Sequence, residues 1–145
     1  MSQEPLLFVR EARAEDLEAI ASIQAAATGA AQWEARDYLA YDCLVAEYGG
    51  RIAGFAVARR TADAPGGESE LLNLAVQPIL CRRGIGRRLL AEIAARHPGT
   101  VWLEVRESNL TARKFYKTFG FCEAGKRYDY YENSREAAIV MNFHS

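Results

Sequence analysis

One junction, between an apolar run and a helical stripe, constrains the fold of this chain more than any other segment. Glu68–Val76 has the composition of a strand and stops before Pro78. A short loop with two glycines follows, and the apolar residues of 85–93 then recur at helical spacing. A strand that leads through such a loop into a helix is typical of α/β sheets with helices packed on their faces.

The loop has the chemistry of an anion site. Gly84 and Gly86 have no Cβ, so a ligand can approach the backbone closely. The helix that follows offers unpaired N–H groups and the positive end of its dipole, which together suit a phosphate or pyrophosphate. Four arginines could add charge-assisted hydrogen bonds: Arg82, Arg83, Arg87 and Arg88. On these residues alone, a glycine-containing turn before a helix with a solvated basic face is an equally good interpretation.

Two other nucleotide motifs fit the loop poorly. A dinucleotide fingerprint would need a third glycine where the chain has Leu89, and too little chain remains for repeated βαβ units. A P-loop would need a Gly-Lys-Ser/Thr sequence, which the chain lacks.

The remaining patterns predict a single domain over residues 1–145 with the order βααβββαβαββ, a mixed α/β sheet. Strands are expected at 6–9, 43–47, 51–59, 68–76, 101–105, 121–130 and 137–143, and helices at 15–27, 33–39, 85–96 and 110–119. Asn109 is a suitable N-cap for the last helix, and Gly120 a suitable C-terminal cap. Two glycines after Tyr48 predict a tight hairpin.

Composition excludes several classes of protein. Eighteen basic and nineteen acidic residues give a net charge of −1, so we expect no nucleic-acid partner. No apolar run is long enough to cross a bilayer and no signal peptide is visible, so we expect no membrane association. Cys43, Cys81 and Cys122 fit neither disulfide nor zinc spacing, which indicates reduced cytoplasmic thiols and no metal. His97 and His144 are predicted to be surface residues.

The ordered motifs resemble a known family. Val76–Leu90 resembles the acyl-CoA-binding motif of the GNAT N-acetyltransferase superfamily, written Gln/Arg-x-x-Gly-x-Gly/Ala. Segments that resemble its ribosomal-protein-alanine branch, the RimI type, are Trp102–Arg106, Ser108–Asn109, Phe115–Phe121, Tyr130–Tyr131 and Glu136–Met141. The chain departs from the pattern at Cys81, which stands at the Gln/Arg position, and at Ala137, where the branch has Asp. The turn before Ala137 is also shorter.

The resemblance implies a GNAT fold, acetyl-CoA as co-substrate and roles for particular residues. It implies Glu104 as the base that accepts a proton through water, and Tyr116 as the acid that protonates the leaving thiolate. Residues implied to bind the coenzyme are Leu74, Ala75, Val76, Arg82, Arg83, Gly84, Ile85, Gly86, Arg87 and Asn109. Without the resemblance, Glu104 is an ordinary strand glutamate and Tyr116 a core aromatic residue.

The same resemblance implies a protein N-terminus as acceptor, with alanine of ribosomal protein S18 as the first candidate. An α-amino group has a pKa of about 7.7–8.0, against about 10.4 for lysine, so it becomes nucleophilic more readily. The resemblance implies that Trp33 and Glu34 border the acceptor; Tyr130 and Tyr131 could line the acceptor groove or could simply be packing residues of the last strands. The alternatives are an acetyltransferase for lysine or small-molecule amines, and an acyl-CoA-binding module without turnover. We expect a monomer or weak homodimer.

Overall fold

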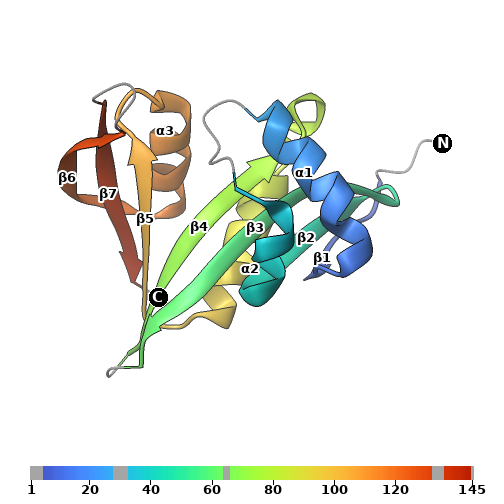
Figure 1. Ribbon diagram of the computed structural model, residues 1–145, viewed down its shortest axis with the longest axis horizontal. Coiled ribbons are helices and arrows are strands. Elements are labelled where there is room, and N and C mark those ends of the chain that lie inside the picture. Colours follow the sequence, from blue (N-terminus) through green and yellow to red (C-terminus); the bar gives the residue numbers. More distant parts are fainter. Residues whose placement is uncertain (1–4, 28–32, 64–65, 132–135, 145) are drawn as a thin grey trace. The chain divides into compact units, whose positions relative to one another are not determined.

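The structure is a computed structural model that describes residues 5–27, 33–63, 66–131 and 136–144. Over these residues the sheet has seven strands in the order β1-β2-β3-β4-β5-β7-β6 (Figure 1). Its elements are β1 (Leu7–Glu11), η1 (Ala14–Asp16), α1 (Leu17–Ala26), η2 (Ala35–Ala40), β2 (Asp42–Tyr48), β3 (Arg51–Ala62), β4 (Glu68–Val76), η3 (Pro78–Leu80), α2 (Ile85–Arg96), β5 (Thr100–Arg106), α3 (Leu110–Phe119), β6 (Cys122–Tyr131) and β7 (Glu136–His144), where η denotes a 3₁₀ helix.

The chain's contacts divide it into two compact units. The first comprises Met1–Arg59 with Leu71–Arg96, and the second comprises Arg60–Glu70 with His97–Ser145. β3 and β4 therefore contribute residues to both units.

In the first unit β1, β2 and β3 form an antiparallel meander. Gly49 and Gly50, with φ of 60° and 81°, make the predicted hairpin between β2 and β3. The middle of β3 is buried on both faces: Phe55 packs with Ile20 of α1, and a Cβ on Gly54 would lie 3.2 Å from Leu89 of α2. The two helices thus cover opposite faces of this part of the sheet.

In the second unit the start of β4 pairs in parallel with β5, and β7 lies between β5 and β6 with antiparallel pairing on both sides. β5 alternates as predicted, with Val101, Leu103 and Val105 buried and Trp102, Glu104 and Arg106 half-buried on the other face. α3 has the predicted bounds. Asn109 Oδ1 accepts from the Ala112 N–H at 3.1 Å, and Gly120, with φ of 132°, caps the other end.

Two predictions need correction. The segment predicted as a helix over 33–39 is the 3₁₀ helix η2, because its bonds run from residue i+3 to residue i, as from Asp37 N–H to the Glu34 carbonyl at 3.0 Å. His97 is not a surface residue: it is 7% exposed, and its Nδ1 lies 3.0 Å from Ser69 Oγ at the start of β4. The predicted turn at 132–135 lies outside the described residues.

Candidate functional site

The predicted phosphate loop follows β4, and hydrogen bonds from Gln77 join its first residue to β3. The Gln77 N–H donates to the Ala53 carbonyl at 2.8 Å, and Gln77 Nε2 donates to the Ile52 carbonyl at 3.0 Å. η3 follows, and the Cys81 thiol lies 3.6 Å from the Gln77 carbonyl oxygen. Since Gln77 anchors the loop through both backbone and side chain, the backbone beyond it starts from a fixed point.

The loop backbone enters the left-handed region twice before α2. Arg82 has φ of 66° and Gly84 has φ of 79°. A Cβ on Gly84 would meet no atom within 4 Å, so the glycine is required for its conformation, and the space above it is open to a ligand. Gly86 lies in the first turn of α2, where any residue could adopt the backbone conformation.

The N-terminus of α2 follows the loop directly. The Arg88 N–H donates to the Gly84 carbonyl at 3.0 Å, so the main-chain hydrogen bonds of the helix reach back to the loop glycine. Ile85 is 1% exposed and anchors this first turn in the core. Twelve residues of aligned peptide dipoles make this terminus suitable for an anion.

The arginines of the loop are exposed. The Arg83 guanidinium carbon lies 6.0 Å from the centroid of the Tyr48 ring, and Arg82, Arg87 and Arg88 also lie at the surface. Exposed guanidinium groups can be recruited by a phosphate, and they equally fit a solvated basic face.

The three residues predicted to offer main-chain groups lie at the end of β4. Ala75 is buried, whereas Leu74 and Val76 are half-buried. A Cβ on Gly54 would lie 2.9 Å from the Ala75 carbonyl oxygen, so β3 approaches β4 closely here. The Leu74 N–H donates to the side chain of its neighbour, Asn73 Oδ1, at 2.9 Å.

Glu104 lies on β5 in the second unit and is held by an arginine that the sequence analysis missed. Glu104 Oε1 accepts from Arg127 Nη1 at 2.6 Å, and the Glu104 side chain is 23% exposed. β5 and β6 are not neighbours, but both pair with β7, Glu104 opposite Val140 and Arg127 opposite Ala138. Positions two apart on β7 share a face, so the ion pair reaches over this strand. Only the strand register could have revealed it.

Tyr116 lies on α3 with its ring in an aromatic cluster. Its centroid is 5.2 Å from that of Phe115 and 5.6 Å from that of Phe121, in edge-to-face geometry. The residue is 9% exposed, and burial raises the pKa of its hydroxyl. The hydroxyl therefore carries a proton at neutral pH, as an acid must and as a core tyrosine also would.

The predicted site residues fall into two groups. The loop and the end of β4 belong to the first unit, and Glu104, Asn109 and Tyr116 belong to the second. Among the residues predicted for the acceptor, Trp33 is 48% exposed, and the side chains of Tyr130 and Tyr131 lie outside those described. Ala137 is buried, and its carbonyl accepts from the Glu107 N–H at 3.0 Å.

The described segments contain no group of three or more His, Cys, Asp or Glu side chains placed to hold a metal ion. None of their helices combines the length and apolar character that a membrane span requires.

The family follows from comparison with known sequences. Residues 7–121 match the profile described as the acetyltransferase (GNAT) family, and the chain belongs to this family. This confirms the resemblance found in the motifs and the mixed α/β fold expected from it.

Similar curated proteins come from bacteria. The chain is 42% identical over 98 residues to the [ribosomal protein bS18]-alanine N-acetyltransferase of Escherichia coli K12. The match covers 63% of this chain and 64% of that protein. It is 39% identical over 97 residues to the N-alpha-acetyltransferase RimI of Mycobacterium tuberculosis. This match covers 66% of this chain and 61% of that protein. The matches thus span less than two thirds of these relatives.

Solved structures match over most of the chain. The crystal structure of the ribosomal-protein-S18-alanine N-acetyltransferase from E. coli gives a TM-score of 0.79 at 32% identity and covers 95% of this chain and 93% of that one. Chaetomium thermophilum Naa20, crystallised with a bisubstrate analogue, gives 0.82 at 26% identity and covers 93% and 85%.

Proposed function

We propose that this protein is an acetyl-CoA-dependent N-acetyltransferase that acts on the N-terminal α-amino group of a protein, and that residues 1–145 act as one catalytic domain. The observation that carries the proposal is the loop before α2, where Gly84 has φ of 79° and open space above it. A diphosphate suits that opening because the amides at the helix N-terminus lie beside it.

The coenzyme contacts we propose follow the motif residue by residue. The diphosphate would bind the backbone of the loop, and Leu74, Ala75 and Val76 would offer main-chain groups to the pantetheine arm. The proposed loop residues are Arg82, Arg83, Gly84, Ile85, Gly86 and Arg87, with Asn109 as a further contact. Because the backbone supplies the main contacts, Cys81 at the Gln/Arg position leaves the cradle intact. Acetyl-CoA supplies the activated thioester.

The chemistry asks for two proton transfers. The neutral amine attacks the thioester carbonyl, the C–N bond forms, and the C–S bond breaks. In our proposal Glu104 accepts the proton of the amine through water, and Tyr116 donates a proton to the departing thiolate. Arg127 holds Glu104 Oε1, and no other hydrogen bond to this carboxylate is found within the described part of the chain, so Oε2 remains for a water.

The acceptor class rests on the relatives. The E. coli protein is an alanine N-acetyltransferase for ribosomal protein bS18, and the M. tuberculosis protein is an N-alpha-acetyltransferase. We propose an N-terminal alanine of ribosomal protein S18 as the first acceptor to test, and such an acceptor would place the reaction in the cytoplasm.

The test is a panel of peptides that differ only in their first residue, incubated with acetyl-CoA and followed by mass shift and thiol release. The proposal expects one acetyl group on the free N-terminus and none on an internal lysine. If an internal lysine is acetylated while the N-terminus stays free, the proposed acceptor is wrong and the ε-amine alternative takes its place. Coenzyme binding without thiol release for any amine would replace it by the non-catalytic one.

A further inference from the structure

Three polar side chains that the mechanism does not use meet in the core of the first unit. Gln24 of α1, Tyr38 of η2 and Asn73 of β4 are 5%, 1% and 7% exposed. The Tyr38 hydroxyl donates to Gln24 Oε1, and Asn73 Nδ2 lies 3.1 Å from both Gln24 Oε1 and the Tyr38 oxygen. We call these three residues the buried triad.

Each end of the buried triad holds a backbone group. Gln24 Nε2 donates to the Trp33 carbonyl at 2.6 Å, and Asn73 Oδ1 accepts from the Leu74 N–H at 2.9 Å. The triad therefore connects the backbone before η2 to the strand that leads into the phosphate loop. Its outer end carries an exposed aromatic side chain, since Trp33 is 48% exposed and Glu34 follows it.

Packing alone does not require polar groups here. The triad is surrounded by the apolar residues of the core, and the Tyr38 ring lies 5.7 Å from that of Phe55. Burial raises the pKa of Tyr38, so the hydroxyl stays protonated and keeps its donor role. Apolar residues of the same shape could fill such a site at similar stability, whereas a hydrogen-bonded network fixes one geometry.

We propose that Gln24, Tyr38 and Asn73 are positioning residues that set acceptor selectivity by holding the backbone of Trp33 in fixed register with that of Leu74. This inference rests on the proposed function. A tryptophan whose carbonyl is held by Gln24 can present its exposed ring to an acceptor in one orientation. The triad acts through the two backbone groups that it holds, the Trp33 carbonyl and the Leu74 N–H.

Tyr38→Phe and Gln24→Met test the inference. The first removes one hydroxyl, and the second removes the bond to the Trp33 carbonyl at similar side-chain volume. For each we expect an acceptor KM about tenfold higher and discrimination between first residues reduced about tenfold, since a buried hydrogen bond commonly contributes that much. Coenzyme affinity should stay within about twofold, because the loop is anchored separately by Gln77.

Phe55→Leu is the matched control, because it loosens the packing around Tyr38 and leaves the hydrogen bonds in place. We expect it to lower stability and to preserve selectivity. Unchanged selectivity in both triad variants, or an equal loss in Phe55→Leu, would overturn the inference.

A binding readout separates this inference from the proposed function. In a Trp102→Phe background the emission of Trp33 reports peptide binding, because the chain has two tryptophans. We expect an N-terminal alanine peptide to shift this emission, and Tyr38→Phe to weaken the titration. A wild type that acetylates the peptide while Trp33 emission stays constant would contradict the triad's role and leave the proposed function standing. A wild type that binds peptide but acetylates no α-amine would contradict only the proposed function.

Discussion

The orientation of the Glu104 carboxylate is determined by two neighbours on β5 and by one arginine that is distant in sequence. Leu103 and Val105 point into the core, so the carboxylate between them points to the other face. Arg127 reaches it from β6 at 2.6 Å. An oriented carboxylate with one occupied oxygen can hold a water in one place, which is what a base acting through water requires.

We expect Glu104→Gln to lower kcat/KM most at low pH. There the α-amine is largely protonated and needs a base most, so the loss should approach about 10²-fold and shrink as the pH rises above about 8. A pH–rate profile from 6 to 9 measures it, with coenzyme affinity as a check that the cradle survives. Glu107→Gln is the control, since Glu107 follows β5 and pairs with Lys126. The same loss at every pH would contradict a base role.

The cysteines test where the coenzyme binds. Cys81 and Cys122 are exposed, whereas burial raises the pKa of Cys43 to about 12. We therefore expect iodoacetamide at pH 8 to label the first two in the native protein and Cys43 only after unfolding. Acetyl-CoA at 100 times its Kd should slow labelling of Cys81 by up to about a hundredfold, because about 1% of sites remain free. Cys122 serves as the internal control, and equal rates with and without acetyl-CoA would place the coenzyme away from the loop.

The residues found from sequence are those whose pattern is local. Gly84 stands out because a strand, a glycine and a helix follow one another along the chain. Arg127 could not be found this way, because its partner is two strands away and only the register with β7 brings them together. His97 was assigned to the surface for the same reason, since its partner Ser69 lies 28 residues earlier.

Among the elements, α3 shows how caps define a helix. Its sequence has a capping residue at each end, Asn109 before the first turn and Gly120 after the last, and the structure has the predicted bounds. η2 lacks such signals and is six residues long, so its geometry is decided by the burial of Tyr38 rather than by its own propensity. The bounds of β4 are as predicted, and the ends of the other strands differ from the prediction by at most three residues, because pairing partners decide where a strand ends.

Asn109→Ala should destabilise the free protein by about 1 kcal/mol, because the Ala112 N–H loses its acceptor. Urea unfolding without coenzyme measures this loss. Leu110→Ala, at an exposed position one residue later, should change stability by less than about 0.5 kcal/mol. If Asn109 also contacts the coenzyme, its variant alone should lose coenzyme affinity. A cap loss with unchanged affinity would restrict Asn109 to the structural role.

For the whole molecule, the element order could be predicted because each segment carries its own periodicity. The grouping of contacts into two units could not, since β3 and β4 are each one continuous strand that contributes residues to both units. The family profile matches residues 7–121, and this range includes strands of both units.

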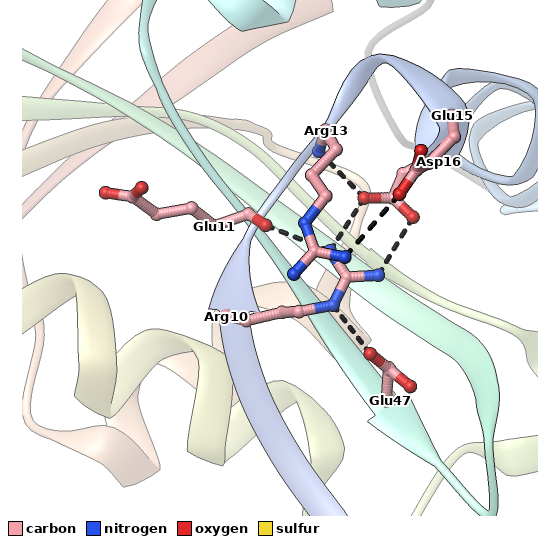
Figure 2. A network of polar contacts seen from close by, with 6 residues as sticks. All are labelled: Arg10, Glu11, Arg13, Glu15, Asp16 and Glu47. Carbon is pink, nitrogen blue, oxygen red and sulfur yellow. Dashed lines mark hydrogen bonds and ion pairs between the residues drawn. The ribbon is translucent and has the colours of Figure 1, made fainter.

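The stability of the whole chain should depend on pH through one buried carboxylate. Asp16 accepts from Arg10 Nη1 and Nη2 at 2.8 and 3.0 Å and from the Arg13 N–H at 2.8 Å (Figure 2). Glu47 accepts from Arg10 Nε at 2.6 Å, so this network joins β1, β2 and the start of α1. The bonds from Arg10 lower the pKa of Asp16 below its usual value.

A lowered pKa in the folded state gives stability that is fully present above the unfolded pKa of about 3.9 and is lost as the pH falls through the folded value. We therefore expect Asp16→Asn to lower the free energy of unfolding by about 2–3 kcal/mol at pH 7, where charged hydrogen bonds to a side chain that is 5% exposed are removed. The difference from the wild type should shrink as urea titrations move from pH 5 to pH 3. Glu15→Gln, on an exposed side chain 3.5 Å from Arg13, should cost less than about 0.5 kcal/mol throughout. A deficit in Asp16→Asn that stays constant down to pH 3 would show that packing, and not the ionised carboxylate, holds the start of α1.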